Sequence, residues 1–200
     1  MTTATLTPPI PKPNAQGPRT VPWTVPDFHR ACEMKFWGDG KRMILIRGEV
    51  VELGPMNPLH ATGVDLVNEA LRVVFQGWRV RVQTPLVLGQ ATDPIPDLSI
   101  FRGGSRDFLA THPATAALVV EVADSSLYFD MTTKAELYAK AGIPDYWILD
   151  LEQRRLLVYR DPAPVPEGAA YRTQLAFKAG DTIAPLAKPD AVIAVAELLP

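Results

Sequence analysis

The sequence predicts an α/β protein in which a mixed β-sheet is flanked by helices on both sides. Three observations lead to this fold class. The predicted elements follow the order helix, three strands, helix, two strands, and residues 117–122 form an almost wholly apolar run, typical of a strand inside a sheet that is covered on both faces. With 200 residues and 47% hydrophobic content, the chain can bury one core, so we expect one domain.

The first 25 residues are set apart by their composition. They hold six prolines and few apolar residues, so this segment is expected to be a disordered or extended arm. The domain is then expected to span residues 26–200 and to begin with a short helix over residues 26–32.

A hairpin and a long helix are predicted next. Residues 43–53 are expected to form two strands around a tight turn at Arg47-Gly48. A helix over residues 59–75 is indicated by apolar residues at three- and four-residue spacing, and Gly77 ends it. The members of that apolar face are Val64, Val67, Leu71 and Val74.

The second half of the chain is predicted to supply most of the sheet. Strands are expected at residues 79–83, 97–101, 117–122, 146–150, 156–159 and 171–177. A second helix is expected over residues 130–141, with Asp130 or Thr133 as its N-cap and with Gly142 and Pro144 ending it. The prolines at 162, 164 and 166 predict a loop before the last strand.

Charge and cysteine content limit the functional classes. A net charge of −2 and a pI near 5.9 argue against binding nucleic acid through diffuse positive charge, but they allow a local basic groove. Cys32 is the only cysteine, so neither an intrachain disulfide nor a cysteine zinc site can form, which fits a cytoplasmic protein. No signal peptide is visible, and no apolar run approaches the length of a membrane span.

Two acids lie beside or within apolar runs. Asp97 follows Pro96, and Glu121 interrupts the strand 117–122, where an unpaired carboxylate is costly. If the two strands are neighbours, both carboxylates converge at one edge of the sheet and can hold Mg²⁺ or Mn²⁺ for phosphodiester hydrolysis. The alternative is that each acid ends a strand in solvent or pairs with an arginine, and the two acids alone leave both interpretations open.

A lysine on the second predicted helix is a further candidate. Asp130, Lys134 and Tyr138 stand four residues apart and share one helix face. Lys134 could orient an attacking water or stabilise negative charge that develops on a phosphate. From the residues alone, an ordinary surface pair between Asp130 and Lys134 is the favoured interpretation.

Several motifs in this order resemble the PD-(D/E)XK restriction-endonuclease-like superfamily, and in particular its Uma-two branch. The resemblance covers about residues 26–200. The matching segments are Arg47-Gly48-Glu49-Val50-Val51, His60, Pro96-Asp97-Leu98-Ser99-Ile100, Leu118-Val119-Val120-Glu121-Val122, Asp130, Lys134, Tyr138 and Gly142-Ile143-Pro144-Asp145-Tyr146-Trp147-Ile148-Leu149-Asp150.

This resemblance implies a mixed core of four to five strands and a metal-dependent nuclease site. Asp97 and Glu121 would be the metal ligands. The superfamily signature places a lysine two residues after the acid, where this chain has Ala123. In the branch that the chain resembles, the lysine has moved to the following helix, which is the position of Lys134.

Three more residues are candidates for the same cleft, besides Asp130 and Tyr138. Glu49 is either a further ligand or a solvated strand acid. His60 could cap its helix or reach a phosphate. The alternative is that it is a surface residue or a local hydrogen-bonding group. Gln83, before the strand of Asp97, is a candidate contact to the site or to DNA. Tyr146 and Trp147 are expected to be core residues.

The leading hypothesis is an Mg²⁺- or Mn²⁺-dependent endonuclease that cleaves DNA through Asp97, Glu121 and Lys134. The alternative is an inactive descendant that uses the fold as a DNA- or protein-binding scaffold, which Ala123 favours. A glycosidase also uses paired carboxylates, but the chain lacks the exposed aromatic residues expected of a sugar cleft. A homodimer is one arrangement that the sequence leaves open.

Overall fold

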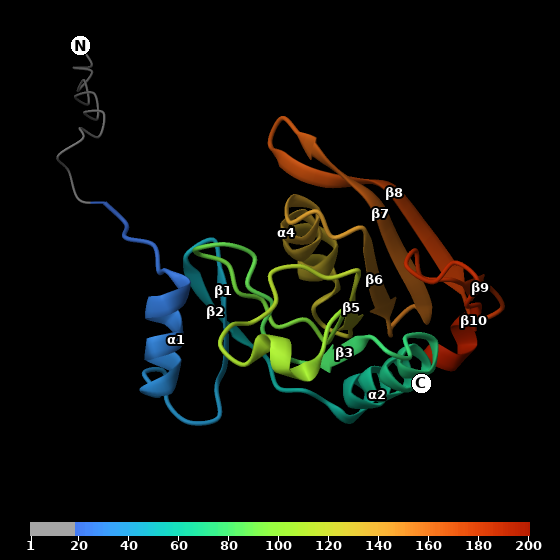
Figure 1. Cartoon of the computed structure of the whole chain (residues 1–200), viewed down its shortest axis with the longest axis horizontal. Helices are drawn as coiled ribbons and strands as arrows, with labels where there is room; N and C mark the ends of the chain where they lie inside the picture. Colours follow the sequence, from blue (N-terminus) through green and yellow to red (C-terminus); the bar gives the residue numbers. More distant parts are fainter. Residues whose placement is uncertain (1–18) are drawn as a thin grey trace, which may run out of the picture.

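A six-stranded mixed sheet forms the centre of the computed structural model, which describes residues 19–200 (Figure 1). The strand order is β3-β4-β5-β6-β7-β8. The bounds are β3 (Arg79–Val82), β4 (Leu98–Phe101), β5 (Leu118–Ala123), β6 (Asp145–Asp150), β7 (Arg155–Val165) and β8 (Gly168–Lys178). The α/β fold class is confirmed, and the sheet has more strands than the four to five that the resemblance implies.

One parallel pair makes the sheet mixed. Strands β5 and β6 run parallel, with Glu121 opposite Ile148, whereas the other neighbours are antiparallel. A parallel pair needs a crossover connection, and here a helical segment supplies it. That segment consists of α3 (Leu127–Phe129), η2 (Asp130–Lys134) and α4 (Ala135–Lys140).

Helices cover both faces of the sheet, as predicted (Figure 1). The helix α2 (Pro58–Val74) packs its apolar face, including Val67 and Leu71, against Val120 and Val122 of β5. On the opposite face α4 packs Tyr138 and Ala139 against the alternate residues of the central strands. Because β5 is covered on both sides, all six of its residues are buried, including Glu121.

The second helix differs from the prediction. It begins at Leu127 rather than at residue 130, and its middle is the π-helical turn η2, in which the Ala135 N–H donates to the carbonyl of Asp130. Neither predicted residue is the N-cap, because Asp130 lies within the helix, buried with its carboxylate bound by Lys134 and Ser126. Such π turns inside helices occur frequently at functional sites.

The proline-rich segment 162–166 was predicted to be a loop, and this was wrong. Strand β7 continues to Val165 and pairs with β8, with Pro162 opposite Tyr171. The physical reason is that β6 pairs only with residues 155–160 of β7. Beyond residue 160 one edge of β7 has no partner strand, so a proline can stand there without removing a ladder hydrogen bond.

The N-terminal part carries α1 (Val25–Glu33) and the predicted hairpin β1 (Arg42–Ile46) and β2 (Glu49–Leu53), with its turn at Arg47-Gly48. Residues 1–18 of the expected arm lie outside the described residues. Later in that segment the Trp23 N–H donates to the Gly48 carbonyl at 2.9 Å. The smaller elements are η1 (Ser105–Phe108), β9 (Thr182–Ile183), β10 (Ile193–Ala194) and η3 (Val195–Leu198).

Within residues 19–200, no helix is both long and apolar enough to span a bilayer.

A glycine sets how closely α2 approaches the sheet. A Cβ at Gly63 would lie 2.9 Å from Val122 Cγ1 and 3.4 Å from Leu151 Cδ2. We predict that Gly63→Ala lowers the free energy of unfolding by about 1 kcal/mol, because overpacking outweighs the higher helix propensity of alanine. In a Val122→Ala background the same change should stabilise, as urea unfolding of the double-mutant cycle would show. An equal effect in both backgrounds would contradict this account.

Candidate active site

The carboxylates of Asp97 and Glu121 meet because their strands are antiparallel neighbours. Leu98 lies opposite Val120 in the β4–β5 ladder, which brings Asp97, just before β4, beside Glu121. The Asp97 N–H points at Glu121 Oε2 at 3.4 Å, and the Val122 N–H donates to Asp97 Oδ2 at 2.9 Å. The predicted convergence of the two acids is therefore confirmed as geometry.

Lys134 reaches the same place from the crossover helix. Its Nζ lies 2.8 Å from Glu121 Oε2 and 2.9 Å from Asp130 Oδ1, and the Tyr138 hydroxyl donates to Glu121 Oε1 at 2.7 Å. The Lys134 side chain is only 8% exposed, so the alternative of an ordinary surface pair is wrong. The helix face predicted from the four-residue spacing points at Glu121.

Two side chains hold Asp97 from the other side of the pocket. His60, in the first turn of α2, places Nε2 at 3.2 Å from Asp97 Oδ1, and Gln83 Nε2 donates to the same oxygen at 3.0 Å. Gln83 has a φ of +47°, a strained value for a residue other than glycine, and its own N–H donates to the Asp97 carbonyl. Asn57 caps α2 and binds Asp124 Oδ2 at 2.5 Å.

The protonation of these groups follows from their burial and their partners. Burial raises the pKa of Glu121 to about 8, although the Lys134 ammonium opposes this shift. Burial alone would lower the pKa of Lys134, but the Glu121 and Asp130 carboxylates outweigh it and raise that pKa above its usual value. Burial and Glu121 also keep the pKa of Tyr138 well above its ordinary value, so its hydroxyl remains a donor.

His60 and Asp97 form the second charged pair. The hydrogen bond to Asp97 raises the pKa of His60. Burial would raise the pKa of Asp97, yet the bonds from His60, Val122 and Gln83 together lower it below its ordinary value. Near neutral pH, Asp97 is therefore ionised.

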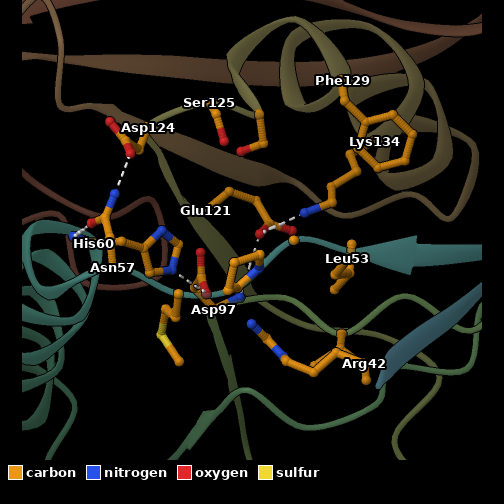
Figure 2. Close-up of a pocket in the computed structure, with 15 residues that line it drawn as sticks. Arg42, Leu53, Asn57, His60, Asp97, Glu121, Asp124, Ser125, Phe129 and Lys134 are labelled. Atoms are coloured by element: carbon orange, nitrogen blue, oxygen red, sulfur yellow. Dashed lines mark hydrogen bonds and ion pairs between the residues drawn. The ribbon is translucent and has the colours of Figure 1, made fainter. Parts of the chain in front are cut away.

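Asp97, Glu121, Lys134 and His60 line one pocket of about 130 Å³. Figure 2 shows these four side chains directed toward one another. The walls of the pocket come from the β2–α2 loop, the first turn of α2, the ends of β4 and β5, and the crossover helix. The residues that line it are Arg42, Leu53, Gly54, Pro55, Met56, Asn57, His60, Ile95, Asp97, Glu121, Asp124, Ser125, Ser126, Phe129 and Lys134.

Of the additional cleft residues predicted, His60 lines this pocket. Gln83, Asp130 and Tyr138 do not line it but contact residues that do. Glu49 begins β2, is exposed, and does not line the cavity, so of its two interpretations the structure gives the solvated strand acid. Among the residues not predicted are Arg42, Asn57 and Asp124. The helix-start pattern Asn57-Pro58 was a usable signal for the cap, whereas nothing in the sequence places Arg42 or Asp124 beside Asp97.

The oxygen donors suit a hard divalent cation. Within residues 19–200 no group of three or more His, Cys, Asp or Glu side chains is arranged to hold a metal. Mg²⁺ does not require one, because it is usually bound by one or two carboxylates with water and substrate phosphates completing the shell. Asp97 and Glu121 are two such carboxylates. The raised pKa of Glu121 indicates that Lys134 alone does not compensate its charge fully.

Comparison with solved structures gives the class of the fold. The chain resembles the crystal structure titled as a "putative nuclease belonging to DUF820" from Anabaena variabilis, with a TM-score of 0.63 and 14% identity. The match covers 78% of this chain and 88% of that one. The protein thus shares its mixed α/β fold with that structure.

The family follows from the sequence itself. The family model described as "Uma2: Putative restriction endonuclease" matches residues 25–196, and the chain belongs to this family. A search of curated proteins finds no match.

The buried lysine gives a prediction about stability. Lys134→Ala leaves Glu121 and Asp130 buried without their shared cation, so the free energy of unfolding should fall by about 3 kcal/mol in urea titrations. The matched control is Lys140→Ala on the same helix, where the side chain is exposed and a change below about 0.5 kcal/mol is expected. Equal losses in the two variants would show that the buried pair does not stabilise the fold.

Proposed function

We propose that this protein is a metal-dependent endonuclease that hydrolyses phosphodiester bonds of DNA at the Asp97–Glu121–Lys134 pocket. The observation that carries the proposal is the meeting of these three side chains, from three separate elements, at one pocket. Membership of a family described as restriction endonucleases supports the same reaction class. The absence of lysine at position 123 does not count against it, because the Lys134 amine occupies the place beside Glu121.

Asp97 and Glu121 would hold Mg²⁺ or Mn²⁺ through their carboxylate oxygens. When bound, the cation would lower the pKa of a water nucleophile and neutralise charge on the attacked phosphate. Both carboxylates retain room for another ligand, since Asp97 Oδ2 and Glu121 Oε1 each accept a single hydrogen bond from the described residues.

Lys134 would act as a fixed cation rather than as a base. Its two acidic neighbours raise its pKa, so the amine keeps its proton. An ammonium group has three N–H donors, and Glu121 and Asp130 engage two of them. The third can donate to a water molecule in the pocket, orient it, and stabilise negative charge that develops on the phosphate.

The remaining cleft residues would position the ligands. Tyr138 and Lys134 fix the two oxygens of Glu121, while His60 and Gln83 fix Asp97. Rigid placement of this kind keeps reacting groups in alignment. The positioning roles of Tyr138, His60 and Gln83 require no contact with the substrate.

Cleavage of supercoiled plasmid with and without Mg²⁺ tests the function. Glu121→Gln and Asp97→Asn should each lower the rate at least about 100-fold, more than loss of a group that only supports a ligand. Glu49→Gln is the matched control, since this exposed acid lies outside the pocket, and it should cut at the wild-type rate. A wild-type protein that binds Mn²⁺ but cuts no DNA, or that binds none, would favour the inactive scaffold instead.

Metal affinity should depend on pH because the proton on Glu121 competes with the cation. Below its pKa of about 8 the carboxyl is protonated in the metal-free protein, so the affinity for Mn²⁺ should rise with pH up to that value and then level off. Asp97 has a lowered pKa and adds no dependence in this range. Calorimetry in buffers of different ionisation enthalpy would show one proton released per Mn²⁺ near neutral pH. A flat affinity between pH 6 and 8 would overturn this reasoning.

A further inference from the structure

Arg42 is a cationic residue in the pocket that belongs to none of the matching motifs and has no role in the proposed reaction. It is the first residue of β1, its side chain is half-buried, and it lines the cavity. Figure 2 shows its side chain extending from the hairpin with the guanidinium toward Asp97. It therefore lies across the pocket from the crossover helix that carries Lys134.

The acids in the pocket already have partners of their own. His60 binds Asp97, Lys134 binds Glu121, and Asn57 binds Asp124. Among the residues that line the pocket, Arg42 is the cationic side chain that makes neither an ion pair nor a side-chain hydrogen bond within the described chain. Its neighbour Lys41, by contrast, is paired with Glu52 at 2.9 Å and does not line the pocket.

A half-buried guanidinium that forms no ion pair within the described residues is stabilised when an anion binds it. A cation bound by Asp97 and Glu121 would add positive charge near Arg42 and so increase the repulsion that the guanidinium experiences. An anion bound between that cation and Arg42 would stabilise both positive charges. The planar fork of arginine matches phosphate in a bidentate arrangement, and the cavity of about 130 Å³ has room for roughly four waters, which suits one phosphate group.

We propose that Arg42 forms a phosphate-binding subsite, in which its guanidinium holds the non-bridging oxygens of a DNA phosphodiester group beside the Asp97–Glu121 pair. This inference rests on the proposed function for the identity of the phosphate, but it concerns binding and not cleavage. It also explains why an arginine without an acidic partner stands next to a site for cations: the subsite is complete only with the substrate present.

The test is DNA binding in EDTA, where no strand is cut, measured by the anisotropy of a short fluorescein-labelled duplex over a series of salt concentrations. Arg42→Gln should weaken binding at least about tenfold, the effect of losing a charge-assisted hydrogen bond. The slope of log K against log salt should fall in magnitude by about 0.9, the value for one phosphate contact on duplex DNA.

Two further variants make the result specific. Arg42→Lys should restore the salt slope but only part of the affinity, since lysine keeps the charge and loses the fork. Lys41→Gln, one residue away and outside the pocket, should change neither quantity. An unchanged slope in Arg42→Gln, or an equal loss in Lys41→Gln, would overturn the subsite.

Thermal stability distinguishes a binding role of Arg42 from a structural role. Because Arg42 has no partner in the described chain, Arg42→Gln should leave the midpoint of thermal unfolding unchanged or raise it. A fall of several degrees would argue that the residue supports the fold.

The subsite and the nuclease proposal can be rejected independently of each other. Plasmid cleavage that needs Asp97, together with an unchanged salt slope, would reject only the subsite, whereas an altered slope in a protein that cuts nothing would reject only the nuclease.

Discussion

Glu121 carries the constraint on which the rest of the site depends. Its carboxylate lies in the middle of an interior strand and is almost fully buried, where an ionised group is stable only with charged and hydrogen-bonding partners. Those partners come from the crossover helix, through Lys134 and Tyr138, and from the backbone ahead of β4. The contacts that satisfy the Glu121 carboxylate thus hold the crossover helix against the sheet and form one wall of the pocket.

In the proposed nuclease, the contacts that stabilise the site would also prepare it for chemistry. Burial keeps the pKa of Glu121 high although Lys134 lies beside it, so a bound cation would add the charge compensation that Lys134 does not supply. Arg42 is the complement of this arrangement, a cation left without an acid. Buried groups that are left partly uncompensated in this way are typical of sites that a ligand completes, where stability is sacrificed for function.

The sequence predicted the elements well where periodicity and turn chemistry act locally. The hairpin at Arg47-Gly48, the helix α2 and the interior strand β5 follow from such patterns. Two elements were missed for physical reasons: the π turn at Asp130–Lys134 has no local signature, and the prolines of β7 are tolerated only because β6 is shorter. For the site, an acid inside an apolar run pointed to Glu121, while the residues alone favoured a surface pair for Lys134.

What the sequence by itself determined is the set of apolar faces, the turns, and the acid in the apolar run of β5, because these depend on neighbours within a few positions. Only the tertiary structure decided which side chains meet. Strand pairing brought Asp97 to Glu121, and the π turn and the crossover aimed Lys134 at them rather than at solvent. The hairpin places Arg42 in the same pocket, although Arg42 precedes Asp97 by more than 50 residues in the sequence. Such juxtapositions depend on packing between distant segments, and no local spacing records them.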